Sequence, residues 1–222
     1  MGSGVTAGMN KIAQTLKRLR PERDMVLVSM MEHHSNDLPH RKHGGHVIHI
    51  PVDTHESKMG CVDMELLEHY LREYEGRVNY VSITGISNVT GIINPINEVA
   101  KLAHHYGAYI VVDAAQMAAH VPIHMSGNKN PDMDVDALIF SGHKTYAPGS
   151  PGVVVARKDL IGKIEYLQEK IVRRQEKTAT LVKAVSQAEA VLKSAWGSIL
   201  DSRPVLKSAG GMAATGSMNG TR

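Results

Sequence analysis

The chain has 222 residues, of which 42% are hydrophobic and 21% charged, and its formal net charge is +3 at pH 7. This composition excludes general disorder, so small a charge surplus argues against a nucleic-acid partner, and without a run of about eighteen apolar residues no membrane partner is expected. A single cysteine, Cys61, excludes an internal disulfide framework and, together with a start that lacks a secretory signal, predicts a cytoplasmic protein.

Short apolar runs alternate with amphipathic segments from the start of the chain. In chain order, the predicted elements are a helix at 5–19, a strand at 25–30, a turn and helix around 36–39, a strand at 46–50, a helix at 63–74 and a strand at 78–84. They continue with a helix at 95–106 and with strands at 109–113, 137–140 and 153–156. This order predicts an α/β fold, a three-layer arrangement in which helices flank a mostly parallel sheet.

The last part of the chain has a different pattern. From Lys158 to about Trp196, apolar residues recur at helical spacing with charges between them. We expect residues 1–160 to form the sheet domain and residues 161–222 a helical tail of unknown role, disordered from Lys207 onward. An amphipathic helix must bury its apolar stripe, either on the sheet domain or against the same helix in another copy.

Polar residues gather where predicted strands end, which is where open α/β sheets bind ligands. The segments are EHHSN at 32–36, SNVTG at 87–91, VDAAQ at 112–116 and SGHK at 141–144. A fifth segment, GSGVT at 2–6, lies at a helix start, where backbone N–H groups favour an anion. Each segment alone also has a structural interpretation: a plain turn at the helix start, a helix cap for Asp113, a surface lysine for Lys144.

Taken together and in this order, the five segments resemble the class V aminotransferases and their cysteine desulfurase relatives. The resemblance covers about residues 2–161 and includes YAPGSPG at 146–152, after the lysine. It implies the large-domain fold of pyridoxal-phosphate-dependent transferases of fold type I. It also implies pyridoxal 5′-phosphate as cofactor, an amino-acid substrate and a homodimer.

The resemblance further implies a role for each site residue. Lys144 would form a Schiff base with the cofactor, Asp113 would keep the pyridine nitrogen protonated, and His33 would stack on the ring. These three are the expected catalytic residues. The other expected cofactor-binding residues are Asn88 and Gln116, near the phenolic oxygen, and Val5, Thr6, Ser141 and His143, around the phosphate.

Simpler interpretations compete for several of these residues. Asn88 and Gln116 can be loop residues that bond only to nearby backbone, and Thr6 can be an ordinary helix-start residue. Five other histidines are expected to be surface or packing residues: His34, His104, His105, His120 and His124. A further four recur every third residue, His40, His43, His46 and His49, but two glycines interrupt them, so no metal site is expected.

Relative to that family, we expect a chain truncated at both ends. It begins inside the phosphate loop, and the stretch after Lys144 is shorter than the family's C-terminal domain. The family's sulfur-accepting cysteine follows the lysine, whereas Cys61 precedes it. Two functions therefore remain: a pyridoxal-phosphate-dependent enzyme acting on an amino acid, as a fragment of a longer enzyme or completed by a partner, or a non-catalytic remnant that acts as an interaction protein. Whether the chemistry is transamination, desulfuration or lyase chemistry stays open.

Overall fold

The computed structural model describes residues 4–55 and 59–201. The chain divides into two compact units, Met1–Lys170 and Ile171–Arg222. Gly2 and Ser3 of the predicted phosphate loop, and the segment after Lys207 for which disorder was predicted, lie outside the described residues.

The first unit is built on one six-stranded sheet with the strand order β2-β1-β3-β4-β5-β6. Strands β1 to β5 pair in parallel and β6 pairs antiparallel with β5, so the predicted mostly parallel sheet is confirmed. The strands are β1 (Met25–Ser29), β2 (His46–Ile50), β3 (Val78–Thr84), β4 (Tyr109–Asp113), β5 (Ala137–Ser141) and β6 (Gly152–Ala156). Strands β1 and β3 are buried at every position. Apolar residues dominate both strands, and the polar Asn79 and Ser82 of β3 are hydrogen-bonded inside the fold.

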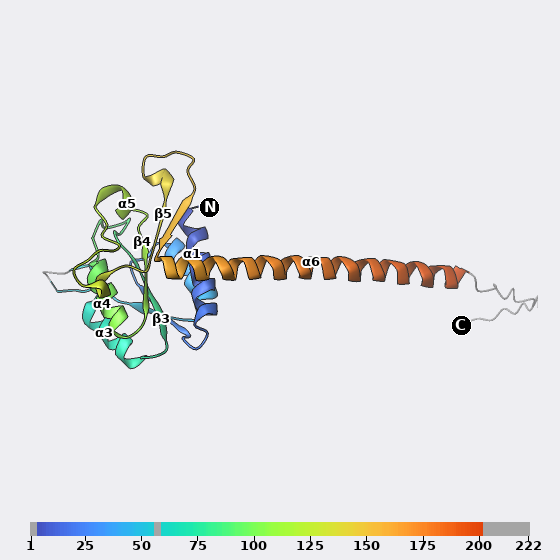
Figure 1. Cartoon of the computed structure of the whole chain (residues 1–222), viewed down its shortest axis with the longest axis horizontal. Coiled ribbons are helices and arrows are strands. Elements are labelled where there is room, and N and C mark those ends of the chain that lie inside the picture. Colours follow the sequence, from blue (N-terminus) through green and yellow to red (C-terminus); the bar gives the residue numbers. More distant parts are fainter. Residues whose placement is uncertain (1–3, 56–58, 202–222) are drawn as a thin grey trace, which may run out of the picture. The chain divides into compact units, whose positions relative to one another are not determined.

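Helices cover both faces of this sheet and complete the three predicted layers (Figure 1). They are α1 (Gly4–Leu19), α2 (His34–His43), α3 (Met64–Glu73), α4 (Ile96–His105) and the short α5 (Met117–His120). A further helix, α6 (Lys158–Asp201), begins in this unit after β6 and continues into the second unit. On one face, α1 packs Met9 and Ile12 into a core cluster that also holds Leu160 from the start of α6. On the other face, Leu67 of α3 and Val99 of α4 belong to a second cluster.

The start of α3 shows how local sequence sets these boundaries. The carboxylate of Asp63 accepts hydrogen bonds from the backbone N–H groups of Glu65 (3.0 Å) and Leu66 (2.9 Å), as its prediction as an N-cap requires. Such a cap stabilises a helix by about 1 kcal/mol. After α4, Gly107 has a φ of +68°, a conformation that glycine adopts without strain and that ends the helix.

The predicted tail helix is present as α6 and reaches Asp201 rather than Trp196. Its first turn belongs to the sheet unit, since Leu160 is only 2% exposed. Every side chain described between residues 172 and 194 is exposed, including the apolar Leu181, Val185 and Leu192. Among the described helices, none is long and apolar enough to cross a membrane.

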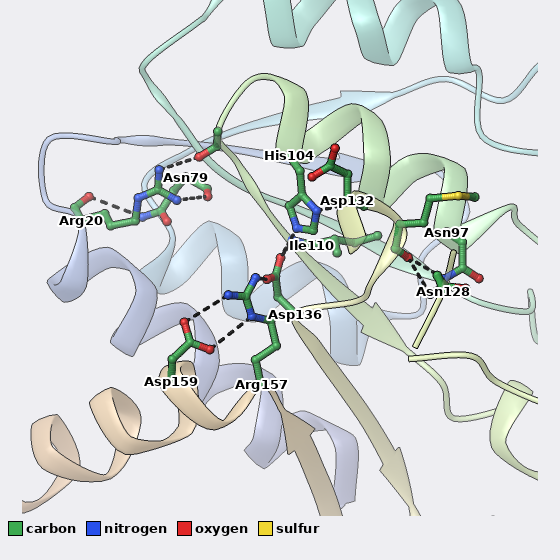
Figure 2. A network of polar contacts seen from close by, with 12 residues as sticks. Arg20, Asn79, Asn97, His104, Ile110, Asn128, Asp132, Asp136, Arg157 and Asp159 are labelled. Carbon is green, nitrogen blue, oxygen red and sulfur yellow. Dashed lines mark hydrogen bonds and ion pairs between the residues drawn. The ribbon is translucent and has the colours of Figure 1, made fainter. Parts of the chain in front are cut away.

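A polar network ties the layers together at the amino edge of the sheet (Figure 2). At its centre lies Asp136, just before β5, which is fully buried. One carboxylate oxygen accepts from His104 Nε2 of α4 and from the backbone N–H of Ile110 in β4, both at 2.8 Å. The other oxygen accepts from Arg157 Nη1 at 3.1 Å, just after β6. This single carboxylate therefore links three strands and one helix.

His104 carries a proton on both ring nitrogens in this network. Nε2 faces the Asp136 carboxylate, and Nδ1 lies 2.7 Å from the backbone carbonyl oxygen of Asp132. Neither oxygen can donate, so both nitrogens must, and the ring is an imidazolium. The hydrogen bond to Asp136 raises the pKa of His104 more than burial lowers it. The surface or packing role expected for His104 is thus a buried structural ion pair.

The network predicts a pH-dependent stability. A histidine whose folded pKa is raised stabilises the fold fully below its unfolded pKa, and this contribution is lost as the pH rises through the folded value. Replacing His104 by glutamine should therefore lower the free energy of unfolding by about 1–3 kcal/mol at pH 6, and by less at pH 9. Urea unfolding at the two pH values measures the difference. The exposed neighbour His105, replaced by glutamine in the same way, should show little loss at either pH; an equal loss for both variants would contradict the assignment.

Candidate functional site

A pocket of about 370 Å³ opens at the carboxyl edge of the sheet. All nine residues predicted as site residues line it: Val5, Thr6, His33, Asn88, Asp113, Gln116, Ser141, His143 and Lys144. Of the remaining lining residues, Gly4, Ser35 and Ala115 lie in the predicted polar segments, whereas Thr84 and Ile86 lie outside them. The volume is within the range of small-molecule sites.

Parallel pairing explains why segments so distant in sequence meet here. Thr84 at the end of β3 pairs with Asp113 at the end of β4, and Asp113 pairs with Ile139 of β5, two residues before Ser141. The residues that follow each strand therefore leave the sheet at the same edge. The start of α1 closes the pocket from the side of β5, where the backbone N–H of Val5 lies 3.0 Å from Ser141 Oγ.

A carboxylate and an amine lie on the strand side of the pocket. Asp113 is 3% exposed, and its Oδ1 accepts a hydrogen bond from the backbone N–H of Ala115 at 2.8 Å. Burial raises the pKa of Asp113, while the Ala115 N–H and the nearby Lys144 and His33 lower it to a smaller extent. Lys144 is exposed and lies in a 3₁₀ turn, Gly142–Lys144, directly after β5. Asp113 thus holds the turn that follows it but does not cap the next helix, because Gln116 occupies the N-cap position of α5. Asp113 also lines the pocket.

The start of α1 presents backbone N–H groups to the pocket. Gly4 has a φ of +79°, and a Cβ on Gly152 would lie 2.4 Å from the Gly4 carbonyl oxygen, so β6 and the helix start can approach only without a side chain there. The Val5 N–H donates to Ser141 Oγ, and Thr6 Oγ1 donates to Ser35 Oγ at 2.8 Å. These two predicted phosphate-binding groups are therefore engaged with protein partners in this structure.

His33 occupies the N-cap position of α2 at another side of the pocket. Its Nδ1 accepts a hydrogen bond from the backbone N–H of Ser35 at 3.1 Å. His34 does not line this pocket; it lines a separate cavity of about 230 Å³ together with Lys42 and Leu38. The placement agrees with the preference for His33 as the residue that faces a ligand.

Glu32, the first residue of the EHHSN segment, has no predicted role but makes three hydrogen bonds beside the pocket. Its carboxyl accepts hydrogen bonds from Asn36 Nδ2 (2.6 Å) and the Thr84 backbone N–H (2.7 Å), and it also bonds to Ser29 Oγ. Burial raises the pKa of Glu32 to about 7, against the lowering effect of these hydrogen bonds. An acidic residue three positions after a mostly apolar strand was the available signal.

Two of the four regularly spaced histidines, His40 and His49, bond to side chains within the fold. The ring of His40 is fully buried between Tyr80 and Asn36, and burial lowers its pKa to about 4. His49 Nε2 pairs with Asp37 at 2.8 Å. Within residues 4–55 and 59–201, no group of three or more His, Cys, Asp or Glu side chains could hold a metal ion.

Comparison with known proteins gives a consistent result. Residues 2–190 match the family described as aminotransferase class-V. Over 162 residues, the chain is 35% identical to a probable cysteine desulfurase of Chlamydia muridarum, an alignment that covers 71% of this chain and 38% of that protein. Over 163 residues it is 32% identical to a cysteine desulfurase of Escherichia coli, covering 71% of this chain and 37% of the relative.

Solved structures give the same match. A crystal structure of a cysteine desulfurase from Escherichia coli superimposes with a TM-score of 0.62 at 29% identity, covering 73% of this chain and 39% of that one. A cysteine desulfurase from Thermococcus onnurineus gives a TM-score of 0.61 at 28% identity, covering 73% and 38%. The chain thus spans well under half the length of these relatives.

Proposed function

The chain belongs to the class V aminotransferase family, and on this premise we propose that its pocket binds pyridoxal 5′-phosphate and serves chemistry on an amino acid. One observation carries the proposal: a single cavity gathers the amine of Lys144, the buried carboxylate of Asp113 and the N-terminus of α1. Members of this family use that cofactor. The pocket offers a complementary group for each of three polar parts of the cofactor: the aldehyde, the pyridine nitrogen and the phosphate.

The residues present fit the cofactor by charge. A phosphate suits the α1 N-terminus, where the Thr6 and Ser141 hydroxyls and His143 join the backbone N–H groups. A protonated pyridine nitrogen suits the buried Asp113, since an opposite charge stabilises a carboxylate that burial otherwise disfavours. The phosphate would compete with Ser141 for the Val5 N–H, so we expect this hydroxyl to rotate when an anion binds.

When bound, pyridoxal phosphate supplies an aldehyde that condenses with amines and a ring that takes up the electrons released at the α-carbon of an amino acid. Lys144 provides the amine, and its 3₁₀ turn aims the side chain into the pocket. In this proposal, His33 at the α2 N-cap would limit the position of a flat ring, and Asn88 and Gln116, which line the pocket, would donate hydrogen bonds to an oxygen on it. The substrate, in this proposal, is an amino acid, and the setting is the cytoplasm.

The assignment of Lys144 has a direct chemical test. Incubation with pyridoxal phosphate followed by borohydride should leave a covalent label on Lys144, located by peptide mass spectrometry. Lys144→Ala should lose the label, because no other amine lines the pocket among the described residues. Lys42→Ala, which changes the neighbouring cavity, should keep it. A label mapped mainly to another lysine would contradict the proposal.

The role of Asp113 is tested separately. Asp113→Asn keeps an oxygen for the Ala115 N–H but removes the negative charge, so the fold should survive while cofactor binding weakens by about tenfold or more. Titration of the visible absorption of the bound cofactor measures the change. Asp132→Asn alters an exposed carboxylate at the opposite edge and should bind as the unaltered chain does. Equal affinities for all three proteins would reduce Asp113 to a turn-capping residue.

We also propose a homodimer, as is general in this family, with the exposed apolar residues of α6 contributing to association. Burying side chains such as Leu181, Val185 and Leu192 would contribute about 1.5–3 kcal/mol each. Sedimentation velocity should give a dimer for the full chain and more monomer for a chain ending at Lys170, the end of the first compact unit. An unchanged oligomeric state after this truncation would exclude the tail from the interface.

A further inference from the structure

The carboxyl of Glu32 joins three elements behind the pocket. Glu32 follows β1, and its Oε1 accepts the backbone N–H of Thr84 at the end of β3 (2.7 Å). Its Oε2 accepts from Asn36 Nδ2 in the first turn of α2 (2.6 Å), and Ser29 of β1 bonds to Oε1. His33, which faces the pocket, and Thr84, which lines it, thus both depend on this one group.

Behind Asn36, the hydrogen bonds continue with a fixed direction. Asn36 Oδ1 accepts from Ser82 Oγ (2.8 Å) and lies 2.9 Å from His40 Nε2. Because an amide oxygen only accepts, Nε2 carries the ring hydrogen of His40, and Nδ1 accepts from the Tyr80 hydroxyl at 2.8 Å. The ring is neutral, in line with the lowering of its pKa by burial. Asn36 must therefore turn its amide N–H₂ toward Glu32.

Only one group in contact with Glu32 can accept a hydrogen bond from the protonated carboxyl. The amide nitrogen of Asn36 and the backbone nitrogen of Thr84 can only donate, whereas the hydroxyl of Ser29 can donate or accept. A proton taken up by Glu32 must consequently sit on Oε1, toward Ser29, and it weakens Oε1 as an acceptor for Thr84. The arrangement has two states with different bonds at the end of β3.

The proton exchanges near neutral pH. Burial raises the pKa of Glu32 to about 7, and the negative charge of Asp113 on β4 adds to the rise. Lys144 and His33 lie near Asp113, and positive charge on these side chains lowers the pKa of Asp113. The remaining titratable groups of the network, His40 and Tyr80, stay neutral at this pH, because burial lowers the pKa of the first and raises that of the second.

We propose that Glu32 is a positioning residue of the pocket, whose proton uptake changes how the α2 N-terminus and the end of β3, and with them His33 and Thr84, are held. The geometry of the hydrogen bonds carries this inference without any ligand. Its bearing on pyridoxal phosphate rests on the proposed function.

The inference is tested first on the full chain without cofactor. In a pH titration followed by NMR, the backbone amide signal of Thr84 should shift with a midpoint near pH 7, and the side-chain amide signals of Asn36 should shift at the same midpoint. Glu98→Gln, which changes an exposed glutamate of α4, should leave both transitions in place. Absence of a Thr84 transition between pH 5 and 9 would overturn the inference.

A double substitution at residues 32 and 36 removes the titrating carboxyl from position 32 while it keeps a hydrogen bond between the two side chains. Glu32→Gln alone sets an amide N–H₂ against Asn36 Nδ2 or the Thr84 N–H, donor against donor, and is expected to destabilise the fold. In Glu32→Gln with Asn36→Asp, residue 32 donates to a carboxylate at position 36, which still accepts from Ser82 and His40. This double variant should fold as the unaltered chain does but lose the Thr84 transition near pH 7. Persistence of the Thr84 transition in the double variant would refute the role of Glu32.

The cofactor is added last, so that the two proposals fail differently. Over the same pH range, the dissociation constant of pyridoxal phosphate should change with a midpoint near pH 7 in the unaltered chain, and the double variant should lose that change. If Lys144 is labelled but the affinity shows no change that depends on Glu32, the inference is wrong and the proposed function stands. If the NMR transitions follow Glu32 but no cofactor binds, the proposed function is wrong and the positioning role stands.

Discussion

Parallel pairing of β1, β3, β4 and β5 is the constraint on which the rest of the molecule depends. Parallel strands all end at the same edge, so the polar residues after each strand are brought together whatever their separation along the chain. Because β1 lies between β2 and β3, the chain leaves β1 in one direction and returns on its other side. With α1 and α2 on one face and α3 on the other, this order leaves room for a pocket at that edge.

Each edge of the sheet holds a buried carboxyl group. The charge of each carboxyl group depends on the groups that bond to it. Asp136 at the amino edge bonds to the His104 imidazolium and the Arg157 guanidinium, so positive charge compensates its burial. Glu32 at the carboxyl edge bonds only to neutral donors, and burial therefore raises its pKa to about 7. The first carboxylate serves as a fixed structural link, whereas the second can exchange a proton beside the pocket.

The chain corresponds to only part of its relatives, and the pocket lies within that part. The chain matches the class V aminotransferase family over most of its length but spans only 37–39% of the relatives described above. That part contains every residue expected to hold the cofactor, because those residues follow strands of one sheet or, like Val5 and Thr6, lie in the first turn of α1.

The sequence by itself determined the order and type of the elements and the residues that meet in the pocket. Continuous apolar runs predicted the buried strands, and Asp63 predicted a helix start, because both are set by local spacing and local hydrogen bonds. Motifs after the strands identified the pocket residues, since parallel topology brings such segments to one edge. The four-residue α5 was not predicted, because so short a helix has no periodicity.

Only the tertiary structure decided the partners of individual polar groups. The Val5 N–H meets Ser141, which is 136 residues away, and His104 meets Asp136 across two elements. The carboxyl of Glu32 meets Thr84, at the end of a strand that the local sequence does not connect with it. Pairings of this kind depend on strand order and on the packing of helices against the sheet, which no local pattern records. They also decide which histidines and carboxyls are charged, since charge in a protein interior follows from the donors and acceptors within reach.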